Sequence, residues 1–495
     1  MNAATSGRCS VPARISTAPQ DRHRLLVLRH GGSELLVAGE WPPFTLPSVK
    51  VPRWERVAEN VMGAVKKRYG ISAICLFTPA LSATTSDGEP PLYQVMEARE
   101  GGAPAPQQTC WVPVHSFSDQ SFADGRDSVA ILRMLRQISE FRSGAVTGPF
   151  GKPGWIEELF FWIQSEIAPY GLRLSGEIRQ LNASPTFALL RLETNGQAVW
   201  FKAVGEPNLR EFAISVTLSR HLAGFVPAVI ATHPSWRGWL TTEFPGRSLD
   251  EVGEPRAWEL AAQTLAELQI TSAGKTDHLL EIGCRDLRVG SLLKLVDPFL
   301  DVMSELMERQ PKTPPSALSR EQLARLGRHI KDALSDLAHL GISDTLGHLD
   351  FNPGNILCSS EHCVFLDWAE AYVGPPFLTF QHLLEHQSQM TLHCVPAPEH
   401  LADHYVSPWV RHVSPSTIAA ALRMMPLLAA FAAAATSDWT GAQRGRDERF
   451  SGYLRSLARR MQREAGTLYA KRRPSDAGLN AMGSPFLSGS AKESR

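Results

Sequence analysis

The sequence lacks an excess of charge of either sign. Its 495 residues include 50 basic and 50 acidic side chains, and charged residues make up 20% of the chain, slightly below the usual ~25%. Disordered chains and proteins that coat nucleic acids both favour a strong net charge. The composition therefore indicates a globular protein, and we expect no nucleic-acid partner.

Cysteine is also scarce, and its arrangement carries no motif. The seven cysteines are odd in number, scattered and never spaced as Cys-x-x-Cys, so the disulfide framework of a secreted protein is not expected. Cys358, His362 and Cys363 lie close together in the sequence but have no fourth zinc ligand nearby. We predict a cytoplasmic protein without a zinc site.

Long hydrophobic runs are absent as well. The most apolar window, 424–435, contains Pro426 and is mostly alanine, and it is shorter than the about 20 residues that span a bilayer. Residues 1–24 are small, polar and basic, which is not the pattern of a signal peptide. The apolar window predicts a buried helix, and no membrane association is expected.

The first half of the chain contains a small α+β domain. A hairpin is indicated at 25–38 by two apolar runs around Gly31-Gly32. A helix is predicted from Pro52, with an apolar face and an end at Gly70. Further predicted elements are extended segments at 73–77, 92–96 and 109–114 and a helix at 128–141.

A stretch rich in glycine and proline, 143–154, predicts a linker. After it the pattern predicts a helix at 155–167, extended segments at 176–181, 187–193 and 198–204, a helix at 208–222 and mainly helices from 257 to 465. An extended pair at 355–358 and 363–367 interrupts these helices. The predicted parts are a flexible N-terminus (1–23), the α+β domain (24–142), the linker (143–154), a β-rich lobe (155–246), a helical lobe (247–470) and a disordered tail (471–495).

The most informative segment is Gly347-His348-Leu349-Asp350-Phe351-Asn352-Pro353-Gly354-Asn355, followed by Leu366-Asp367-Trp368. Phosphoryl transfer needs a carboxylate that positions the attacking hydroxyl, and oxygen ligands for the Mg²⁺ that bridges the phosphates. A loop that brings Asp350 and Asn355 to one point supplies both. A short hairpin would return Asp367 beside Asn355.

These motifs resemble those of the aminoglycoside phosphotransferase family, whose members share the bilobal protein-kinase-like α+β fold. The resemblance covers 178–376 and implies that ATP and Mg²⁺ are the cofactors. It implies that Asp350 is the catalytic base, that His348 braces the loop, and that Asn355 and Asp367 bind magnesium. The sequence departs from the family at Leu349 and Asn352, and neither of these residues would supply the base or a metal oxygen.

The upstream segments fit the same resemblance. Lys202 lies on the third extended segment and would meet the phosphates, and Glu211 on the next helix would hold it. Ser184 and Thr186 lie in the expected phosphate loop, 182–186, which contains no glycine. An ordinary β-turn is an equally good interpretation of this loop.

The lobes are expected to be joined by the segment 240–246. Backbone groups near Glu243 and Phe244 could pair there with adenine. Because this pairing uses main-chain atoms, the identity of the side chains says little about it. Downstream, Thr379 stands near the position where the family often has an aspartate and could cap the next helix.

The N-terminal domain is weakly similar to a Nudix hydrolase in its order of hairpin, helix and strand. That family needs clustered glutamates to hold metal and pyrophosphate. An alignment on Gly70-Ile71 places Ala64, Lys67 and Arg68 at those positions. The resemblance therefore implies a catalytically silent domain.

Together these patterns predict an ATP- and Mg²⁺-dependent phosphotransferase acting on a hydroxyl of a small molecule. Acidic residues such as Glu370 and Glu385 could meet a cationic acceptor. The alternative is a silent nucleotide-binding regulatory or scaffold protein, which the glycine-free phosphate loop favours and the complete set of Asp350, Asn355 and Asp367 opposes. The sequence names neither the acceptor nor the oligomeric state.

Overall fold

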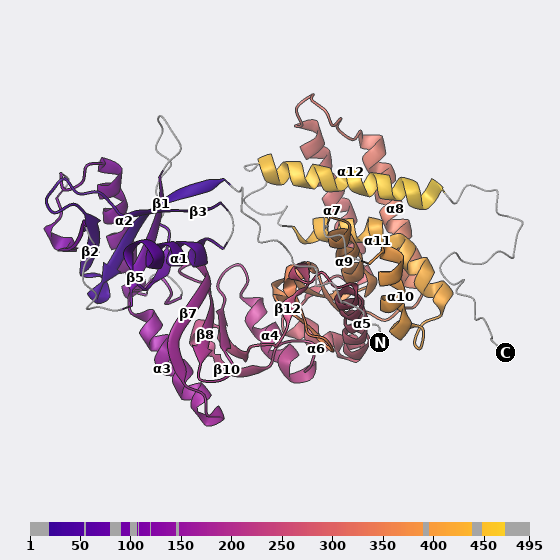
Figure 1. The fold of residues 1–495 in the computed structure, drawn as a ribbon. Helices are drawn as coiled ribbons and strands as arrows, with labels where there is room; N and C mark the ends of the chain where they lie inside the picture. The colour runs from indigo at the N-terminus through magenta and orange to yellow at the C-terminus, as the bar shows by residue number, and fades with distance from the viewer. Residues whose placement is uncertain are drawn as a thin grey trace, which may run out of the picture. The chain divides into compact units, whose positions relative to one another are not determined.

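The computed structural model describes residues 19–53, 56–79, 91–99, 106, 108–118, 120–144, 148–389, 396–437 and 448–470 (Figure 1). The predicted tail, 471–495, and residues 1–18 of the predicted flexible N-terminus lie outside the described residues. The chain forms two compact units. The first unit comprises Met1–Phe212 and Pro227–Glu243, and the second comprises Ala213–Val226 and Phe244–Arg495.

A six-stranded mixed sheet forms the centre of the N-terminal domain, with strand order β4-β5-β1-β2-β6 and β3 paired to β1. Its strands are β1 (Gln20–Arg29), β2 (Glu34–Ala38), β3 (Ser48–Pro52), β4 (Ala73–Phe77), β5 (Leu92–Ala98) and β6 (Thr109–Pro113). The predicted hairpin is confirmed, because β1 and β2 pair antiparallel. β1 also pairs parallel with β5.

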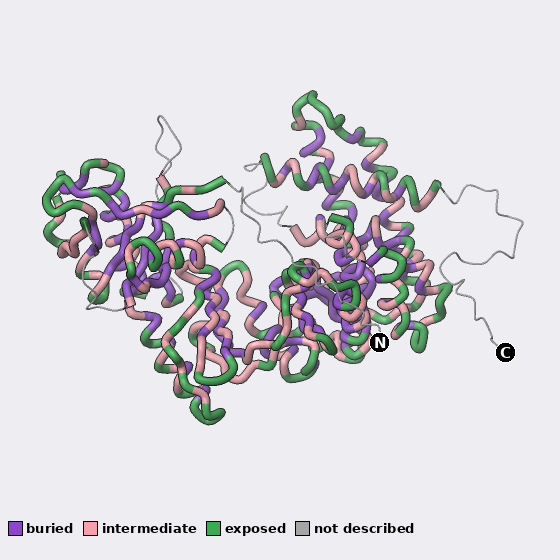
Figure 2. Tube along the Cα trace, viewed as in Figure 1, coloured by how far each residue is buried: buried purple, intermediate pink, exposed green. Residues whose placement is uncertain are grey.

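β1 explains why this sheet has helices on both faces. Its residues Leu25 to Leu28 are all fully buried, and Figure 2 shows the buried colour along the strands of this sheet. Successive side chains of a strand point to opposite faces. Leu26 and Leu28 join a core with helix α2 (Gly125–Arg142), and Leu25 and Val27 join a core with helix α1 (Val57–Tyr69).

The predicted start of the first helix is wrong. Pro52 ends β3, where it is opposite Gln20 of β1, and the helix begins at Val57. β3 pairs only with β1, and a strand edge tolerates a residue without an N–H group. Gly70 ends the helix in the left-handed conformation, as the sequence predicts.

A second, antiparallel sheet of five strands has the order β10-β11-β9-β8-β7. The elements of this part are α3 (Trp155–Ile167), β7 (Leu174–Ala183), β8 (Ala188–Thr194), β9 (Val199–Ala203), α4 (Arg210–His221), β10 (Val229–His233) and β11 (Gly238–Thr242). Here the structure agrees with the predicted helix at 155–167 and with the three predicted extended segments.

The N-terminal domain and this second sheet share one hydrophobic core. The core contains Leu26 and Met134 of the N-terminal domain together with Trp155, Leu190 and Phe201. Phe150, from the segment predicted to be a linker, is 2% exposed and packs edge-on against Trp155 at 5.0 Å. Residues 148–154 are called the connecting segment below. Through Phe150 this segment is packed into the shared core of the first unit.

Eight helices, in addition to most of α4, dominate the described part of the second unit. They are α5 (Pro255–Ser272), α6 (Thr276–Glu281), α7 (Val289–Glu308), α8 (Arg320–His339), α9 (Phe377–Gln389), α10 (Pro398–Trp409), α11 (Pro415–Thr436) and α12 (Glu448–Ala470). α11 contains the predicted apolar helix. It is the one described helix long and apolar enough to cross a membrane, and 61% of its apolar window is buried inside the structure, as the core helix of a folded protein would be.

Short strands in the second unit carry the motif residues. They are β12 (Arg247–Ser248), β13 (Arg285–Asp286), β14 (Thr345–His348), β15 (Ile356–Cys358), β16 (Cys363–Phe365) and β17 (Ala371–Gly374). β15 and β16 are the predicted extended pair, whereas the other four strands were not predicted. They form two three-stranded sheets, β12-β15-β16 and β13-β17-β14.

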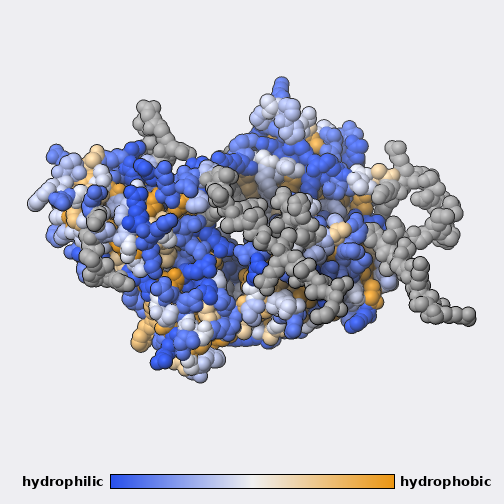
Figure 3. Space-filling model, viewed as in Figure 1, coloured by the Kyte–Doolittle hydropathy of each residue, from blue (hydrophilic) through white to orange (hydrophobic). Residues whose placement is uncertain are grey.

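The described surface shows no broad apolar face in the drawn view. Figure 3 shows hydrophilic residues predominating there, with apolar residues in small patches. Exposed large apolar side chains such as Trp41 and Phe161 are each more than 80% exposed, and isolated apolar residues of this kind are ordinary on protein surfaces.

Candidate active site

A buried ion pair links two predicted site residues in the first unit. Alternate residues of β9 are buried, and Lys202 lies on the opposite side of the strand from Phe201. The Lys202 ammonium contacts the Glu211 carboxylate, and their side chains are only 14% and 1% exposed. The structure therefore brings together Lys202 and Glu211, which were predicted from the sequence to form a pair.

Two aromatic rings lie near the Lys202 ammonium. Its nitrogen lies 5.9 Å from the centre of the Phe187 ring and 5.8 Å from that of Trp239. Cation–π contacts at partly desolvated sites add to the stability of a charge. The ammonium is thus fixed in position by Glu211 and by the two rings.

The expected phosphate loop is a hydrogen-bonded turn. The Ser184 N–H donates to the Phe187 carbonyl at 3.2 Å, and the Thr186 N–H donates to the Ser184 hydroxyl at 3.3 Å. Two donors of the loop are thus already used within the turn. Ser184 and Thr186 are both half-buried.

The predicted interlobe segment contains the boundary between the two units, which falls between Glu243 and Phe244. Both backbone groups of Glu243 are paired, because its N–H donates to the Ala198 carbonyl and its carbonyl accepts from the Gln197 side chain. Its carboxylate accepts from Arg191 at 2.9 Å, and this arginine lowers the pKa of the carboxyl group. The Phe244 carbonyl also accepts, from the Gly246 N–H at 2.8 Å, so the Phe244 N–H is the remaining backbone candidate for pairing with a base.

His348 connects the predicted catalytic loop to the predicted metal-binding segment in the second unit. Its Nδ1 accepts from the Asp350 N–H at 3.1 Å, so the ring proton is on Nε2, which donates to the Leu366 carbonyl at 2.9 Å. Complete burial lowers the pKa of this imidazole, against the raising effect of the Leu366 carbonyl and nearby carboxylates. A neutral His348 therefore connects the two segments through both of its ring nitrogens.

Asp350 is exposed at the end of this loop and is held by two amides. Its Oδ1 accepts from the Asn352 side chain at 2.9 Å, and its Oδ2 lies 3.3 Å from the Asn355 amide nitrogen. The Asn355 amide nitrogen also donates to the Asp350 carbonyl at 3.0 Å. The carboxylate is therefore oriented before any substrate binds. This role of Asn352 was not evident from its position in the sequence.

Asp367 is brought next to Asn355 by the β15–β16 hairpin. The Leu366 N–H donates to the Asn355 carbonyl at 2.9 Å, one residue before Asp367. Asp367 is exposed and has left-handed backbone angles, φ 62° and ψ 61°. Non-glycine residues adopt this conformation at a cost, and such strain is concentrated at functional sites.

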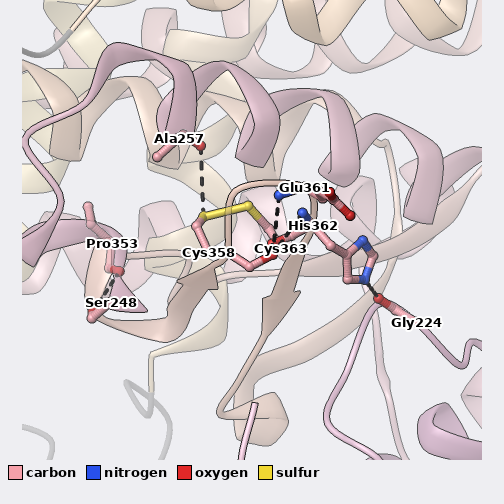
Figure 4. The surroundings of a disulfide bond; sticks show 9 residues. Gly224, Ser248, Ala257, Pro353, Cys358, Glu361, His362 and Cys363 are labelled. Atoms are coloured by element: carbon pink, nitrogen blue, oxygen red, sulfur yellow. Dashed lines mark hydrogen bonds between the residues drawn. A yellow bond between two sulfur atoms is a disulfide. The ribbon is translucent and has the colours of Figure 1, made fainter. Parts of the chain in front are cut away.

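A disulfide bond joins the two strands of this hairpin, which the sequence analysis did not expect. Cys358 and Cys363 are opposite each other in the strand register and are bonded through their sulfurs (Figure 4). The neighbouring His362 ring contacts the Gly224 carbonyl. Because both thiols are used in the bond, these cysteines provide no thiolate ligands for zinc.

The oxygen atoms around the hairpin suit Mg²⁺. Since the Asn355 nitrogen is occupied by Asp350, its Oδ1 is the atom left to act as a ligand, and Asp367 adds a carboxylate. Carboxylate and amide oxygens, completed by water and substrate phosphates, are the usual environment of Mg²⁺. The arrangement can therefore hold a metal–phosphate substrate beside an oriented carboxylate.

Thr379 of α9 supports the catalytic loop, a role that its sequence position did not reveal. Its hydroxyl is fully buried and accepts from the His348 N–H at 2.9 Å, and it also contacts the Tyr372 hydroxyl at 3.0 Å. Thr379 is the third residue of α9, so it is not the cap of that helix as suggested. Its hydroxyl instead ties the first turn of α9 to the start of the catalytic loop.

The two carboxylates suggested for a cationic acceptor are both paired with arginines. Glu370 lies 2.7 Å from Arg285, and Glu385 contacts Arg460 of α12. Neither carboxylate is the unpaired anion that the prediction requires. A positively charged acceptor therefore gains no support from these residues.

A buried histidine beside this region predicts sensitivity to acid. Burial lowers the pKa of His382 on α9 to about 4, and the titratable groups facing it are Glu385, His386, Arg460 and His348. Its contribution to stability is present above its unfolded pKa of about 6.5 and is lost as the pH falls towards 4. Between pH 7.5 and 5 we expect about 2 kcal/mol less free energy of unfolding from this group.

Urea unfolding at the two pH values checks this expectation. His382→Leu should lose most of that pH dependence, and His400→Leu, at an exposed position of α10, should keep all of it. An unchanged pH dependence in His382→Leu would contradict the expectation.

Comparison with known proteins finds a family match for one part of the chain. The sequence profile of the phosphotransferase enzyme family matches residues 205–411. The match includes Glu211, His348, Asp350, Asn355 and Asp367, and it begins just after Lys202. No curated protein matches the chain in sequence.

Several solved structures are similar to the chain at low identity. A choline/ethanolamine kinase family protein from Mesorhizobium loti is 16% identical, with a TM-score of 0.41, over 62% of this chain and 94% of that one. A macrolide 2′-phosphotransferase from Brachybacterium faecium is 15% identical, with a TM-score of 0.39, over 63% and 98%. A choline kinase from Cryptosporidium parvum is 12% identical, with a TM-score of 0.43, over 64% and 97%.

The profile match agrees with the predicted phosphotransferase family over residues 205–411, and the mixed α+β elements agree with the predicted protein-kinase-like fold. The match does not reach residues 24–142. The Nudix resemblance of that region therefore stays a prediction.

Proposed function

We propose that this chain, whose residues 205–411 belong to the phosphotransferase enzyme family, transfers the γ-phosphoryl group of Mg²⁺-bound ATP to a hydroxyl group of a small molecule. The observation that carries the proposal is the set of oxygen-bearing side chains of Asp350, Asn355 and Asp367 held together by His348 and Leu366. The cytoplasm is the proposed compartment.

In this proposal Asp350 accepts a hydrogen bond from the acceptor hydroxyl and then takes its proton. The hydroxyl oxygen attacks the γ-phosphorus, the bond from that phosphorus to the bridging oxygen breaks, and the nucleoside diphosphate leaves. Asn352 and Asn355 hold the carboxylate in one orientation, which lowers the entropic cost of reaching the reactive geometry.

The remaining residues act on the charge of the phosphates. Asn355 and Asp367 would hold the magnesium that accompanies the nucleotide, and the ion would supply positive charge to offset the negative charge on the phosphate oxygens. Lys202, held by Glu211, is assigned to the phosphates. The Phe244 N–H is assigned to the base, and the hydroxyls of Ser184 and Thr186 to the phosphate loop.

A transfer screen tests this function. ATP and Mg²⁺ are incubated with a panel of choline, ethanolamine, a macrolide, an aminoglycoside and simple sugars. The first three acceptors are suggested by the solved structures named above. The phosphorylated products are detected by mass spectrometry. We expect phosphate on at least one acceptor, dependent on Mg²⁺.

A silent nucleotide-binding protein is the second candidate. It is favoured by the glycine-free phosphate loop, where the turn already uses the N–H groups of Ser184 and Thr186. Binding of ATP without transfer to any acceptor or to the protein itself would support this candidate over the phosphotransferase.

A further inference from the structure

The expected phosphate loop is packed tightly against the connecting segment. Gly148 has φ +100°, and a Cβ atom there would lie 2.6 Å from the Pro185 carbonyl oxygen and 3.1 Å from the Thr186 Cα. Real side-chain carbons do not approach a backbone oxygen this closely. The loop itself lacks glycine, but a glycine of the connecting segment permits close contact with it.

The position of the connecting segment is fixed by an aromatic anchor two residues later. Phe150 is 2% exposed, and its ring contacts those of Trp155 at 5.0 Å, Trp236 at 5.8 Å and Phe201 at 6.4 Å. Phe201 directly precedes Lys202 on β9. Movement of this segment would therefore require opening the core behind the predicted phosphate-binding lysine.

The strand that leads into the loop is also held by the N-terminal domain. The buried side chain of Gln180 on β7 accepts from the Cys75 N–H at 2.8 Å and donates to the Cys75 carbonyl at 2.9 Å. Gln180 is 1% exposed and Cys75 is fully buried. These two bonds attach β7 to β4 a few residues before Ser184, because buried amide groups are costly to leave unpaired.

From these contacts we propose that the N-terminal domain, residues 20–142, together with the connecting segment, acts as a brace that positions the phosphate loop for nucleotide binding. Gly148 lets the connecting segment lie directly against the loop, and Gln180 ties the preceding strand, β7, to β4. Both are therefore positioning residues. The inference rests on the proposed function, because it takes 182–186 as the phosphate loop. It also assigns a role to a domain for which the sequence analysis predicted no catalysis.

Gly148→Ala tests the contact with the loop. The new methyl group must displace Pro185 and Thr186, and displacements of about 1 Å at a positioning group cost up to about 100-fold. We expect the KM for ATP to rise about tenfold, whereas kcat and the KM for the acceptor stay within about twofold. Gly144→Ala is the matched control, since Gly144 also has positive φ, +75°, but a Cβ atom there has no atom within 4 Å.

Gln180→Met tests the attachment of β7 with a side chain of similar length. It should raise the KM for ATP in the same way as Gly148→Ala. Gln94→Met is the control, because Gln94 is also buried and donates to the Phe77 and Val95 carbonyls at 3.1 and 3.2 Å, within the N-terminal domain alone. A general loss of stability would affect both glutamine variants, but only Gln180→Met should change nucleotide affinity.

Amide hydrogen exchange of 183–187 gives a readout independent of catalysis. Exchange in this segment should become faster in Gly148→Ala and Gln180→Met and stay unchanged in the two controls. If neither variant changes this exchange or the KM for ATP, the brace is wrong even if the enzyme transfers phosphate. If the unaltered chain transfers no phosphate but the exchange changes as expected, the proposed function fails and the mechanical coupling stands.

Discussion

Asp350→Asn is expected to lower kcat for phosphate transfer by about three orders of magnitude, because general-base catalysis contributes about 10²–10⁴-fold. The amide cannot take the acceptor proton, although its size preserves the packing of the loop. Asp350 is exposed, so the loss should occur without unfolding. Steady-state kinetics gives kcat, and circular dichroism checks that the protein is folded.

Two further variants make this result interpretable. Asp350→Ala removes both carboxylate oxygens and should lose at least as much activity, whereas Asp301→Asn, at an exposed position of α7, should keep full activity. Binding of ATP should be retained in all three. Equal rates for the parent protein and both Asp350 variants would reject Asp350 as the base.

Lys202→Met is expected to reduce kcat/KM for ATP by about 10²–10³-fold, since a single preorganised electrostatic group commonly contributes that much. It should also destabilise the protein. Glu211 is 1% exposed, and a buried charge that loses its partner costs about 3–5 kcal/mol. Urea unfolding and steady-state kinetics measure the two effects separately.

The double variant Lys202→Met/Glu211→Gln separates charge balance from catalysis. Removal of both charges should restore most of the stability, because a neutral glutamine is far easier to bury than an unpaired carboxylate. The activity should remain as low as that of Lys202→Met. An active double variant would mean that Lys202 does not act on the phosphates.

Local patterns predicted which of the candidate side chains lie together, because these residues are close to one another in the chain. The segment from His348 to Asn355 forms one loop, and the alternation around Lys202 places it on the face opposite Phe201. The β15–β16 hairpin returns the chain to Asn355 through a turn of a few residues. Contacts between residues close in the chain depend mainly on spacing and on strand periodicity.

Long-range contacts were not visible in the sequence. The composition of 143–154 predicted a linker. Glycine and proline indicate the backbone conformation of a segment, however, and do not indicate whether it is exposed to solvent. In the structure Phe150 anchors this segment in a shared core. The Thr379–His348 bond likewise joins residues 31 positions apart, and it depends on how α9 packs beside β14.

The central claim is that Asn355 and Asp367 hold one divalent cation beside Asp350. The most direct test is a crystal structure of the protein with Mn²⁺ and a non-hydrolysable ATP analogue, in which anomalous scattering locates the metal. We expect a manganese peak within coordination distance of Asn355 Oδ1, the Asp367 carboxylate and the nucleotide phosphates. A bound nucleotide whose manganese lies away from both side chains would contradict the account.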